Sequence, residues 1–490
     1  MLRKPASPCG PGSEYAREGA ARRAGGRPIR TIGREGPPPV IDLSAARLAA
    51  ATGGELAAGD PERAGPERAV IDSRAVQPGD LFVGLPGAAA DGGAYAPAAL
   101  EAGAWGAVVG RDHRDSALQA VEGTVGHSAC SGAAVIAVEE PLAALLALAR
   151  AWRHELGASV VGVTGSTGKT STKDILAALL GARLVTHSSR ENWNTEIGLP
   201  LTILEAPRGT EALVLEMAMR GEGQIAELVA VAEPDVGVIV NVGPVHLALL
   251  GTVERVAAAK AELIRDLRPG AACVVPASEP LLAAHLREQE LDTWSFGPGG
   301  QVRLLSFDQG RAEIEARDEI VTLELPYSEP HNLLNTLAAV GAARALDVPV
   351  GGRVEVRFSS LRGEVVELPG GVTVVNDCYN ANPMSMRAAL DHLAASGAER
   401  RIAVLGTMAE LGPDSDRYHR EIGAHAGTLG IDVLVPVGVA ALPYTQGFDG
   451  ETLPVAGPEE ASALLEELAR PGDRVLIKGS RSVGLERVLG

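Results

Sequence analysis

Residues 160–171 restrict the possible folds of this chain more than any other stretch. They read Val-Val-Gly-Val-Thr-Gly-Ser-Thr-Gly-Lys-Thr-Ser. The β-branched start predicts a short buried strand, and apolar residues at helical spacing from Lys169 to Leu180 predict a helix. A strand, a glycine-rich turn and a helix in this order are typical of a phosphate-binding loop, because backbone N–H groups and the helix N-terminus point toward an anion.

Six consecutive residues of this loop are candidate phosphate ligands: Gly165, Ser166, Thr167, Gly168, Lys169 and Thr170. Lys169 supplies a full positive charge, and Thr170 offers a hydroxyl to a Mg²⁺ ion that bridges the phosphates. Val163 stands where the common pattern has its first glycine. An ordinary glycine-rich turn is the alternative, and the coincidence of strand, Gly-Lys-Thr and helix argues against it.

Length and composition narrow the class of protein. A chain of 490 residues is too long for one hydrophobic core and suggests about three domains. With 46% hydrophobic and 22% charged residues, the chain is predicted to be globular. The formal net charge of −18 argues against general nucleic-acid binding. The four cysteines form no C-x-x-C pair, which fits a reducing cytoplasm and excludes a zinc ribbon.

Residues 1–39 differ from the rest in composition. They are rich in Arg, Gly and Pro and lack a hydrophobic segment, so they are not a secretory signal. We expect either a disordered basic extension or a start codon assigned too far upstream; a functional basic arm is a third, weaker alternative. No apolar run in the chain reaches the roughly 20 residues of a membrane span, so none is expected.

From residue 40 onward strands and helices alternate, which predicts an α/β protein. The pattern divides into a small α/β domain over residues 40–140, a central P-loop-type ATPase domain with a mostly parallel sheet over 155–351, and a Rossmann-like domain over 352–490. In the first domain Asp72, Ser73 and Arg74 follow a short apolar strand. A hydroxyl and a guanidinium there suit a diphosphate-bearing ligand, although a structural turn is the commoner explanation.

Polar side chains also follow strands of the central domain. Glu216 ends one strand, and His246 comes shortly after the next. Because the carboxyl ends of parallel strands meet where an α/β sheet binds ligands, Glu216 is a candidate ligand of Mg²⁺ or water and His246 can complete a metal shell. A solvated glutamate and a plain loop histidine are the alternatives. The polar loop 192–198 adds Asn194 and Thr195.

Lys260 lies within the apolar face of a predicted helix that spans residues 253–267. Either its stem packs while its ammonium reaches solvent, or burial lowers its pKa so that it reacts with CO₂ and the resulting carbamate binds a metal. The sequence leaves both open.

Asn332 and Asn335 lie three residues apart on a predicted helix, so their amides share one face. Two such amides can bind an adenine edge, and two solvated asparagines would fit equally well. In the last domain, polar loops follow predicted strands at residues 377–383, 406–412 and 478–482.

These segments, in this order, resemble the Mur ligases over about residues 40–490. The resemblance is carried by residues 165–170, 192–198, Glu216, His246, Lys260, His331, Asn332, Arg362, Asp377, Tyr379, Asn380 and 408–412. The family's phosphate loop also lacks the first glycine, so Val163 agrees with it. Loops 377–383 and 408–412 are more similar to the branch that adds D-alanyl-D-alanine than to the branches that add diaminopimelate or lysine. Cys378 and Thr407 depart from the usual residues there.

The resemblance implies an ATP-dependent ligase that joins D-alanyl-D-alanine to UDP-N-acetylmuramoyl-tripeptide through an acyl phosphate. This is a cytoplasmic step of peptidoglycan precursor synthesis. A monomer without nucleic-acid partners is expected. The alternatives are another Mur-type amino-acid ligase and a non-catalytic nucleotide-binding scaffold.

The resemblance also implies roles for single residues. It assigns Lys169, Glu216, His246 and Lys260 to catalysis, one Mg²⁺ to Thr170 and Glu216, and a second Mg²⁺ to His246 and carbamylated Lys260. Asn332 and Asn335 would hold adenine, Asp377 the ribose, and Arg362 the triphosphate after a hinge motion near residue 352. Asp72, Ser73 and Arg74 would bind the UDP end. Asn194, Thr195, Tyr379 and Asn380 are further candidate substrate contacts.

Overall fold

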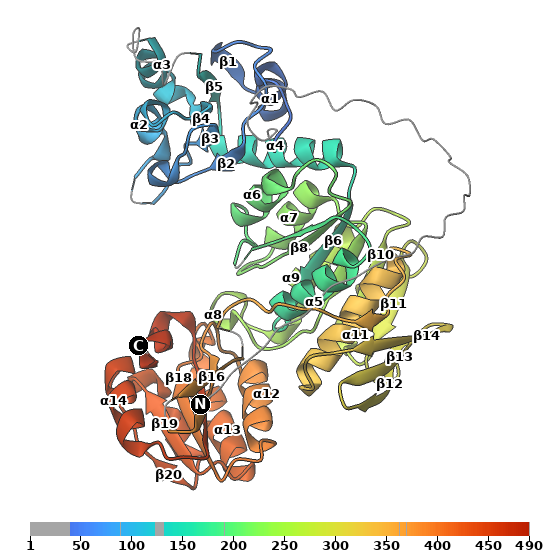
Figure 1. Cartoon of the computed structure of the whole chain (residues 1–490), viewed down its shortest axis with the longest axis vertical. Coiled ribbons are helices and arrows are strands. Elements are labelled where there is room, and N and C mark those ends of the chain that lie inside the picture. The colour runs from blue at the N-terminus through green and yellow to red at the C-terminus, as the bar shows by residue number, and fades with distance from the viewer. Residues whose placement is uncertain are drawn as a thin grey trace, which may run out of the picture. The chain divides into compact units, whose positions relative to one another are not determined.

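The computed structural model describes residues 40–88, 90–122, 132–190, 192–361, 363–368 and 370–489. The expected extension over residues 1–39 and the candidate Arg362 lie outside these ranges. From Pro39 to Gly490 the chain forms one compact unit. The described part contains three β-sheets, each flanked by helices (Figure 1), which confirms the predicted α/β class. None of its helices is long and apolar enough to cross a membrane.

The first sheet has the strand order β1-β5-β4-β3-β2, with only β1 antiparallel to its neighbour. Its strands are β1 (Glu55–Ala58), β2 (Arg68–Val70), β3 (Asp80–Val83), β4 (Gly106–Gly110) and β5 (Ala134–Val138). Its helices are α1 (Ala45–Thr52), α2 (Ala96–Glu101) and α3 (Arg114–Glu122). The helix α4 (Pro141–Leu156) leads to the central sheet, and its buried Trp152 donates to Ala206 O at 3.0 Å.

The central sheet has ten strands in the order β15-β14-β13-β12-β11-β10-β9-β6-β8-β7. From β7 to β12 neighbouring strands are parallel, and β13 pairs antiparallel with both β12 and β14. The parallel strands are β6 (Ser159–Thr164), β7 (Thr186–Ser188), β8 (Ala212–Glu216), β9 (Val236–Ile239), β10 (Ala272–Pro276), β11 (Asp292–Phe296) and β12 (Val302–Asp308). The others are β13 (Arg311–Ala316), β14 (Glu319–Glu324) and β15 (Gly352–Arg353).

Both faces of this sheet are buried, which explains why its parallel strands read as nearly continuous apolar runs. On one face α5 (Lys169–Gly181) and α11 (Pro330–Ala345) pack side by side (Figure 1), and Val161 points into their core. Val160 points into the opposite core, as the two-residue period of a strand requires. That core includes residues of α6 (Gly198–Glu205), α7 (Gln224–Ala232) and α9 (Val253–Asp266).

The last sheet has the order β16-β17-β21-β18-β19-β20 and is parallel except for the pair of β16 and β17. Its strands are β16 (Glu364–Leu368), β17 (Val372–Asp377), β18 (Arg400–Gly406), β19 (Val433–Val437), β20 (Glu451–Thr452) and β21 (Asp473–Lys478). Its helices are α12 (Pro383–Ala394), α13 (Ser415–Thr428) and α14 (Pro458–Leu468). Parallel pairing aligns the ends of β17 and β21, so Asp377 lies opposite Lys478.

The chain remains attached to the central sheet beyond residue 352. Strand β15 pairs with β14. Val354, Val356 and Phe358 then pack against the core shared by α5 and α11. We call residues 354–360 the connector, because the last sheet follows it.

Candidate active site

The phosphate loop lies between β6 and α5, as predicted. Gly168 has a φ of +76°, a conformation that favours glycine. A Cβ atom at this position would lie 2.6 Å from Oδ1 of Asn335 on α11. Glycine therefore lets α11 approach the loop closely. Lys169, the first residue of α5, folds over the loop and donates from Nζ to Gly165 O at 2.8 Å.

Asn241 holds the loop in shape. It follows β9, the strand next to β6. Its Oδ1 accepts from the backbone N–H groups of Ser166 at 3.1 Å and Thr167 at 2.9 Å, and its Nδ2 donates to Thr167 O at 3.1 Å. The sequence pattern alone assigns no role to Asn241. The available signal was its position at the end of a parallel strand, where ligand-binding residues gather.

Thr170 and Glu216 meet beside this loop. The hydroxyl of Thr170 donates to Oε2 of Glu216 at 2.8 Å, and Nδ2 of Asn194 donates to Oε1 at 2.8 Å. The meeting follows from topology, because β8 pairs with β6 and places Glu216 next to Val163. Glu216 is only 1% exposed, so the solvated alternative is wrong.

This pair fits a Mg²⁺ ion. A hydroxyl and a carboxylate are hard oxygen ligands, and Mg²⁺ is usually bound by one or two carboxylates together with substrate phosphates. Within the described ranges no group of three or more His, Cys, Asp or Glu side chains is suited to a metal. Thr170 and Glu216 would therefore supply the protein ligands while the nucleotide supplies the rest.

Lys260 is buried inside α9, with 2% of its surface exposed. The alternative in which its ammonium reaches solvent is therefore wrong. Burial, with a smaller effect from the charge of Lys169, lowers the pKa of Lys260 well below its ordinary value. Among the described carboxylates none forms an ion pair with it. A buried amine with a lowered pKa fits the carbamate hypothesis and leaves it untested.

His246 lies near the same two lysines, whose charges both act on its ring. It precedes α8 (Leu247–Leu250) with a left-handed φ of +54°, and its Nδ1 bonds to a carboxylate oxygen of Glu410. Burial lowers the pKa of His246, and the charge of Glu410 opposes that shift. Glu410 is itself left-handed, with a φ of +62°, and its carbonyl accepts from Ala248 N at 3.0 Å.

Asn332 and Asn335 are both buried in the first turns of α11. Nδ2 of Asn335 donates to Oδ1 of Asn332 at 3.4 Å, which confirms that the amides share a face. Since both side chains are buried, the interpretation of this pair as two solvated asparagines is wrong. The close approach of Asn335 to Gly168 places the pair beside the phosphate loop.

Loop 377–383 of the last domain also reaches the phosphate loop. Nδ2 of Asn382 donates to Ser166 O at 3.4 Å. Asp377 bonds to Nζ of the buried Lys478 at 2.6 Å, and the same Nζ donates to Asn380 O at 3.0 Å. The sequence showed Lys478 only as part of a polar loop, because residue spacing does not reveal which carbonyl group a lysine will contact. Tyr379 N donates to Leu361 O at 3.3 Å.

In the candidate substrate loop of the first domain, the charged side chains of Arg74 and Asp72 bond to each other. Nε and Nη2 of Arg74 donate to the two carboxylate oxygens of Asp72, at 2.9 and 2.7 Å. These hydrogen bonds lower the pKa of Asp72 to about 2. Ser73 begins a short 3₁₀ turn that Asp72 caps, and both charged side chains are exposed.

In the central domain Thr195, another candidate substrate contact, is exposed, and its carbonyl accepts from Leu199 N.

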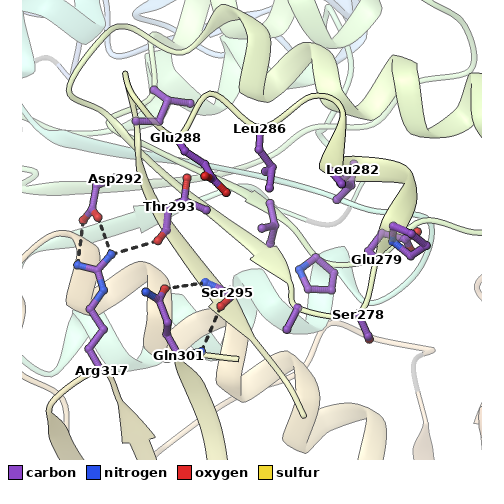
Figure 2. Close-up of a pocket in the computed structure, with 16 residues that line it drawn as sticks. Ser278, Glu279, Leu282, Leu286, Glu288, Asp292, Thr293, Ser295, Gln301 and Arg317 are labelled. Carbon is purple, nitrogen blue, oxygen red and sulfur yellow. Dashed lines mark hydrogen bonds and ion pairs between the residues drawn. The ribbon is translucent and has the colours of Figure 1, made fainter. Parts of the chain in front are cut away.

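A separate cavity of about 750 Å³ lies among residues 275–317 (Figure 2). None of the residues described above lines it. Its polar groups bind one another: Arg317 pairs with Asp292, and the side-chain oxygen of Gln301 accepts from Ser295 N at 3.1 Å. The candidate active site is therefore the region around the phosphate loop and not this cavity.

Three family models match the chain in order. Residues 69–153 match the Mur ligase family catalytic domain, residues 163–343 the Mur ligase middle domain, and residues 361–481 the Mur ligase glutamate ligase domain. The chain belongs to the Mur ligase family. This Mur ligase is 37% identical to the UDP-N-acetylmuramoyl-tripeptide–D-alanyl-D-alanine ligase of Mycobacterium leprae, in an alignment that covers 91% of this chain and 97% of that protein.

Solved structures of MurF proteins share the fold of this Mur ligase. A crystal structure of MurF from Acinetobacter baumannii superposes with a TM-score of 0.79 at 26% identity and covers 91% of this chain and 98% of that one. The MurF ligase from Thermotoga maritima, solved in complex with ADP, gives a TM-score of 0.73 at 33% identity, covering 86% and 96%. The fold and the family expected from the sequence are thereby confirmed.

Proposed function

We propose that this Mur ligase joins D-alanyl-D-alanine to UDP-N-acetylmuramoyl-tripeptide at the expense of ATP, a step of peptidoglycan synthesis. The structural observation that carries the proposal is the 2.8 Å contact of Thr170 with Glu216 beside the phosphate loop. Relatives named for this activity match the chain over nearly their whole length. A kinase or a GTPase switch would share the phosphate loop but would not need the two flanking domains.

The reaction needs an activated carboxylate, because a free carboxylate is a poor acyl donor. The terminal carboxylate of the tripeptide attacks the γ-phosphorus of ATP, the bond to the leaving ADP breaks, and an acyl phosphate forms. The amine of D-alanyl-D-alanine then attacks the acyl carbon, inorganic phosphate leaves with the bonding electrons, and the amine loses a proton. The protein contributes positioning and charge neutralisation.

The phosphate loop supplies most of this neutralisation. Lys169 and the backbone N–H groups of the loop bind the β- and γ-phosphates. Thr170 and Glu216 would hold a Mg²⁺ ion, which neutralises charge on the phosphates when bound. Asn194, bonded to Glu216, keeps the carboxylate oriented.

Lys260 and His246 are assigned to a second Mg²⁺ ion. The neutral amine of Lys260 would add to CO₂ and release a proton, and the carbamate so formed would offer oxygen ligands. The burial of Lys260 supports this assignment. Its test is a ¹³C NMR spectrum of protein equilibrated with ¹³C-bicarbonate: a carbamate signal that is absent from Lys260→Met supports it, and identical spectra contradict it.

The remaining assignments concern the ends of the substrates. Asn332 and Asn335 are proposed to hold adenine, Asp377 the ribose, and Arg362 the triphosphate. Asp72, Ser73 and Arg74 are proposed to bind the UDP end, and Asn194, Thr195, Tyr379 and Asn380 the acyl and amine substrates. Since all these groups come from one chain and the reaction consumes ATP, we propose a monomer that works in the cytoplasm.

The decisive experiment measures phosphate release from ATP and Mg²⁺ with UDP-N-acetylmuramoyl-tripeptide, in the presence and absence of D-alanyl-D-alanine. We expect release only with both substrates and a product heavier by one dipeptide. Release supported instead by free diaminopimelate or lysine would identify a ligase that adds a different amino acid. Nucleotide binding without turnover under every condition would favour a scaffold.

A further inference from the structure

The helix that follows the phosphate loop carries a second lysine, and this one is buried. Lys173 lies one turn after Lys169 on α5 and is 2% exposed. Its Nζ donates to Ser189 O at 2.7 Å and pairs with Oδ1 of Asp174 at 2.8 Å. The proposed reaction assigns no role to this ion pair. Because a buried lysine must be held by polar partners, its contacts show what it stabilises.

Ser189 connects Lys173 to the candidate metal ligand. It directly follows β7, and its N–H donates to Val214 O at 3.0 Å in the neighbouring strand β8. Its hydroxyl accepts from the backbone N–H of Glu216 at 3.0 Å. Lys173 therefore holds Ser189, and Ser189 holds the backbone of Glu216. All three residues are at most 2% exposed.

Asp174 connects the same ion pair to the connector. While Oδ1 faces Lys173, Oδ2 accepts from both N and Oγ of Ser359, at 2.9 and 3.1 Å. The preceding residue, Phe358, packs against the ring of Tyr327 with centroids 5.4 Å apart. The connector is thus bonded to the central domain as far as Ser359.

Two residues after Ser359, at Leu361, the chain belongs to the last domain. Leu361 has a left-handed φ of +60°, and its carbonyl accepts from Tyr379 N. Its side chain packs against the core of the last sheet. The change from one domain to the other is therefore confined to residues 359–361.

We propose that Lys173 is a positioning residue for Glu216 and that Asp174 joins this position to the connector at Ser359. The inference rests on the proposed function, since it takes Glu216 as a metal ligand. The physical basis is that a buried ion pair with satisfied hydrogen bonds is held as a unit, and loss of one member leaves the others unpaired. Movement of the connector then displaces Ser189 and Glu216 through Lys173.

The first test replaces Lys173 by a neutral side chain of similar length, Lys173→Met. Its readouts are the affinity for Mn²⁺ in the presence of ADP, measured by electron paramagnetic resonance, and the affinity for ADP in EDTA. Because groups that orient metal ligands are typically worth 10–100-fold in metal affinity, we expect Mn²⁺ binding about 10-fold weaker. The affinity for metal-free ADP should change less than about twofold, since the ammonium of Lys173 is bonded to Ser189 O and Asp174 and not to the phosphate loop.

A purely structural role would lower the melting temperature without separating these two affinities. Unchanged Mn²⁺ affinity in folded Lys173→Met overturns the proposal. Should that variant not fold, Ser189→Ala decides the matter, because it removes only the hydroxyl that accepts from Glu216 N. We expect it to weaken Mn²⁺ binding in the same direction, and an unchanged affinity would again overturn the proposal.

The connector is tested by a double-mutant cycle of Asp174→Ala and Ser359→Ala. We expect Ser359→Ala to weaken Mn²⁺ binding several-fold in the wild-type background and to have no effect once Asp174 is absent. Ser360→Ala is the matched control, because Ser360 is exposed and adjacent. Independent, additive effects would contradict the link between connector and Glu216.

These outcomes are separable from the proposed activity. A wild-type protein that binds ADP and Mn²⁺ but releases no phosphate would refute the ligase function while the cycle still tests the positioning network. Conversely, an active wild-type enzyme with unaltered Mn²⁺ affinity in all the variants would refute only the network.

Discussion

The ammonium of Lys478 and the carboxylate of Asp377 lie 2.6 Å apart at the adjacent ends of β21 and β17. Lys478 is 2% exposed, and it also donates to the carbonyl of Asn380. One buried cation therefore fixes both the proposed ribose ligand and the loop that follows it. The geometry of this loop depends on an ion pair between residues 101 positions apart in the sequence.

We expect Lys478→Met to destabilise the last sheet. Breaking a buried pair costs about 3–5 kcal/mol, and we expect the lower end of that range, about 3 kcal/mol, because Asp377 keeps partial contact with solvent. The measurement is hydrogen–deuterium exchange of peptides from β17 and β21 in the full chain. The affinity for ATP should fall as well, since Asp377 loses its fixed position.

The double variant Asp377→Asn with Lys478→Met is the control for that prediction. Replacing both partners removes the unpaired buried charge, so protection of β17 and β21 should recover toward wild type while the affinity for ATP stays low. Equal loss of protection in the single and double variants would show that the pair does not stabilise this sheet.

Gly168→Ala should weaken nucleotide binding. The substitution places a side chain in a left-handed conformation, which costs about 1–2 kcal/mol, and directs its Cβ at Asn335. Since every 1.4 kcal/mol is about tenfold in affinity, we expect the affinity for ATP to fall about 10-fold or more. Isothermal titration with ADP and Mg²⁺ measures it.

Gly181→Ala provides the matched control at the other end of α5. Gly181 is helical, and a Cβ there meets no atom within 4 Å. The added methyl group should raise the free energy of unfolding by about 0.4–1 kcal/mol and leave nucleotide affinity unchanged. Equal loss of affinity in both variants would mean that the helix, and not the loop conformation, controls binding.

The part of the site that was predicted from the sequence is the part that local geometry determines. A strand, a glycine turn and a helix are adjacent along the chain, so residues 165–170 were placed without knowledge of the fold. Glu216 was found because parallel strands align their carboxyl ends. Lys260 was noticed because a lysine in an apolar helix face is unusual, although only the structure shows that it is buried.

The missed residues act through tertiary contacts with backbone atoms. Asn241, Ser189 and Lys478 bind N–H or C=O groups of distant segments, and no sequence spacing specifies which group a side chain will meet. That β11 and the strands after it extend the central sheet depends on the pairing of β11 with β10. Pairing of this kind is a property of the folded chain.

Thr170→Val should separate metal binding from nucleotide binding. The variant keeps the shape of the side chain and removes the hydroxyl that contacts Glu216. We expect the concentration of Mg²⁺ for half-maximal activity to rise about 10–100-fold, with little change in the affinity for ADP in EDTA. A magnesium titration of phosphate release measures the first quantity.

Thr172→Val is the control for a hydroxyl on the same helix. Thr172 is fully buried, and its Oγ1 has no hydrogen-bond partner among the described residues. Removing an unsatisfied buried hydroxyl should leave activity unchanged and raise stability by up to about 1 kcal/mol. A rise in the magnesium requirement of this variant would indicate that any change in α5 disturbs the metal site.

We expect His419 to make the last domain sensitive to acid. It is fully buried on α13, its Nε2 accepts from Met408 N at 3.0 Å, and its Nδ1 donates to Ser415 O at 2.7 Å. It thereby supports the start of the loop that carries Glu410. Burial lowers the pKa of His419, and the bond to Ser415 opposes this shift.

The sign of the effect follows from that lowered pKa. Above the unfolded pKa of about 6.5 the imidazole is neutral in both states and adds no pH dependence. As the pH falls below 6.5, the unfolded chain takes up the proton first, so this site lowers the free energy of unfolding by up to about 1.4 kcal/mol per pH unit until the folded pKa is reached. His419→Gln keeps one donor and one acceptor but cannot titrate. The drop in melting temperature between pH 7.5 and pH 5.5 should therefore be smaller in His419→Gln than in the wild type. Equal drops would show that the folded and unfolded states take up this proton equally, so that His419 adds no pH dependence.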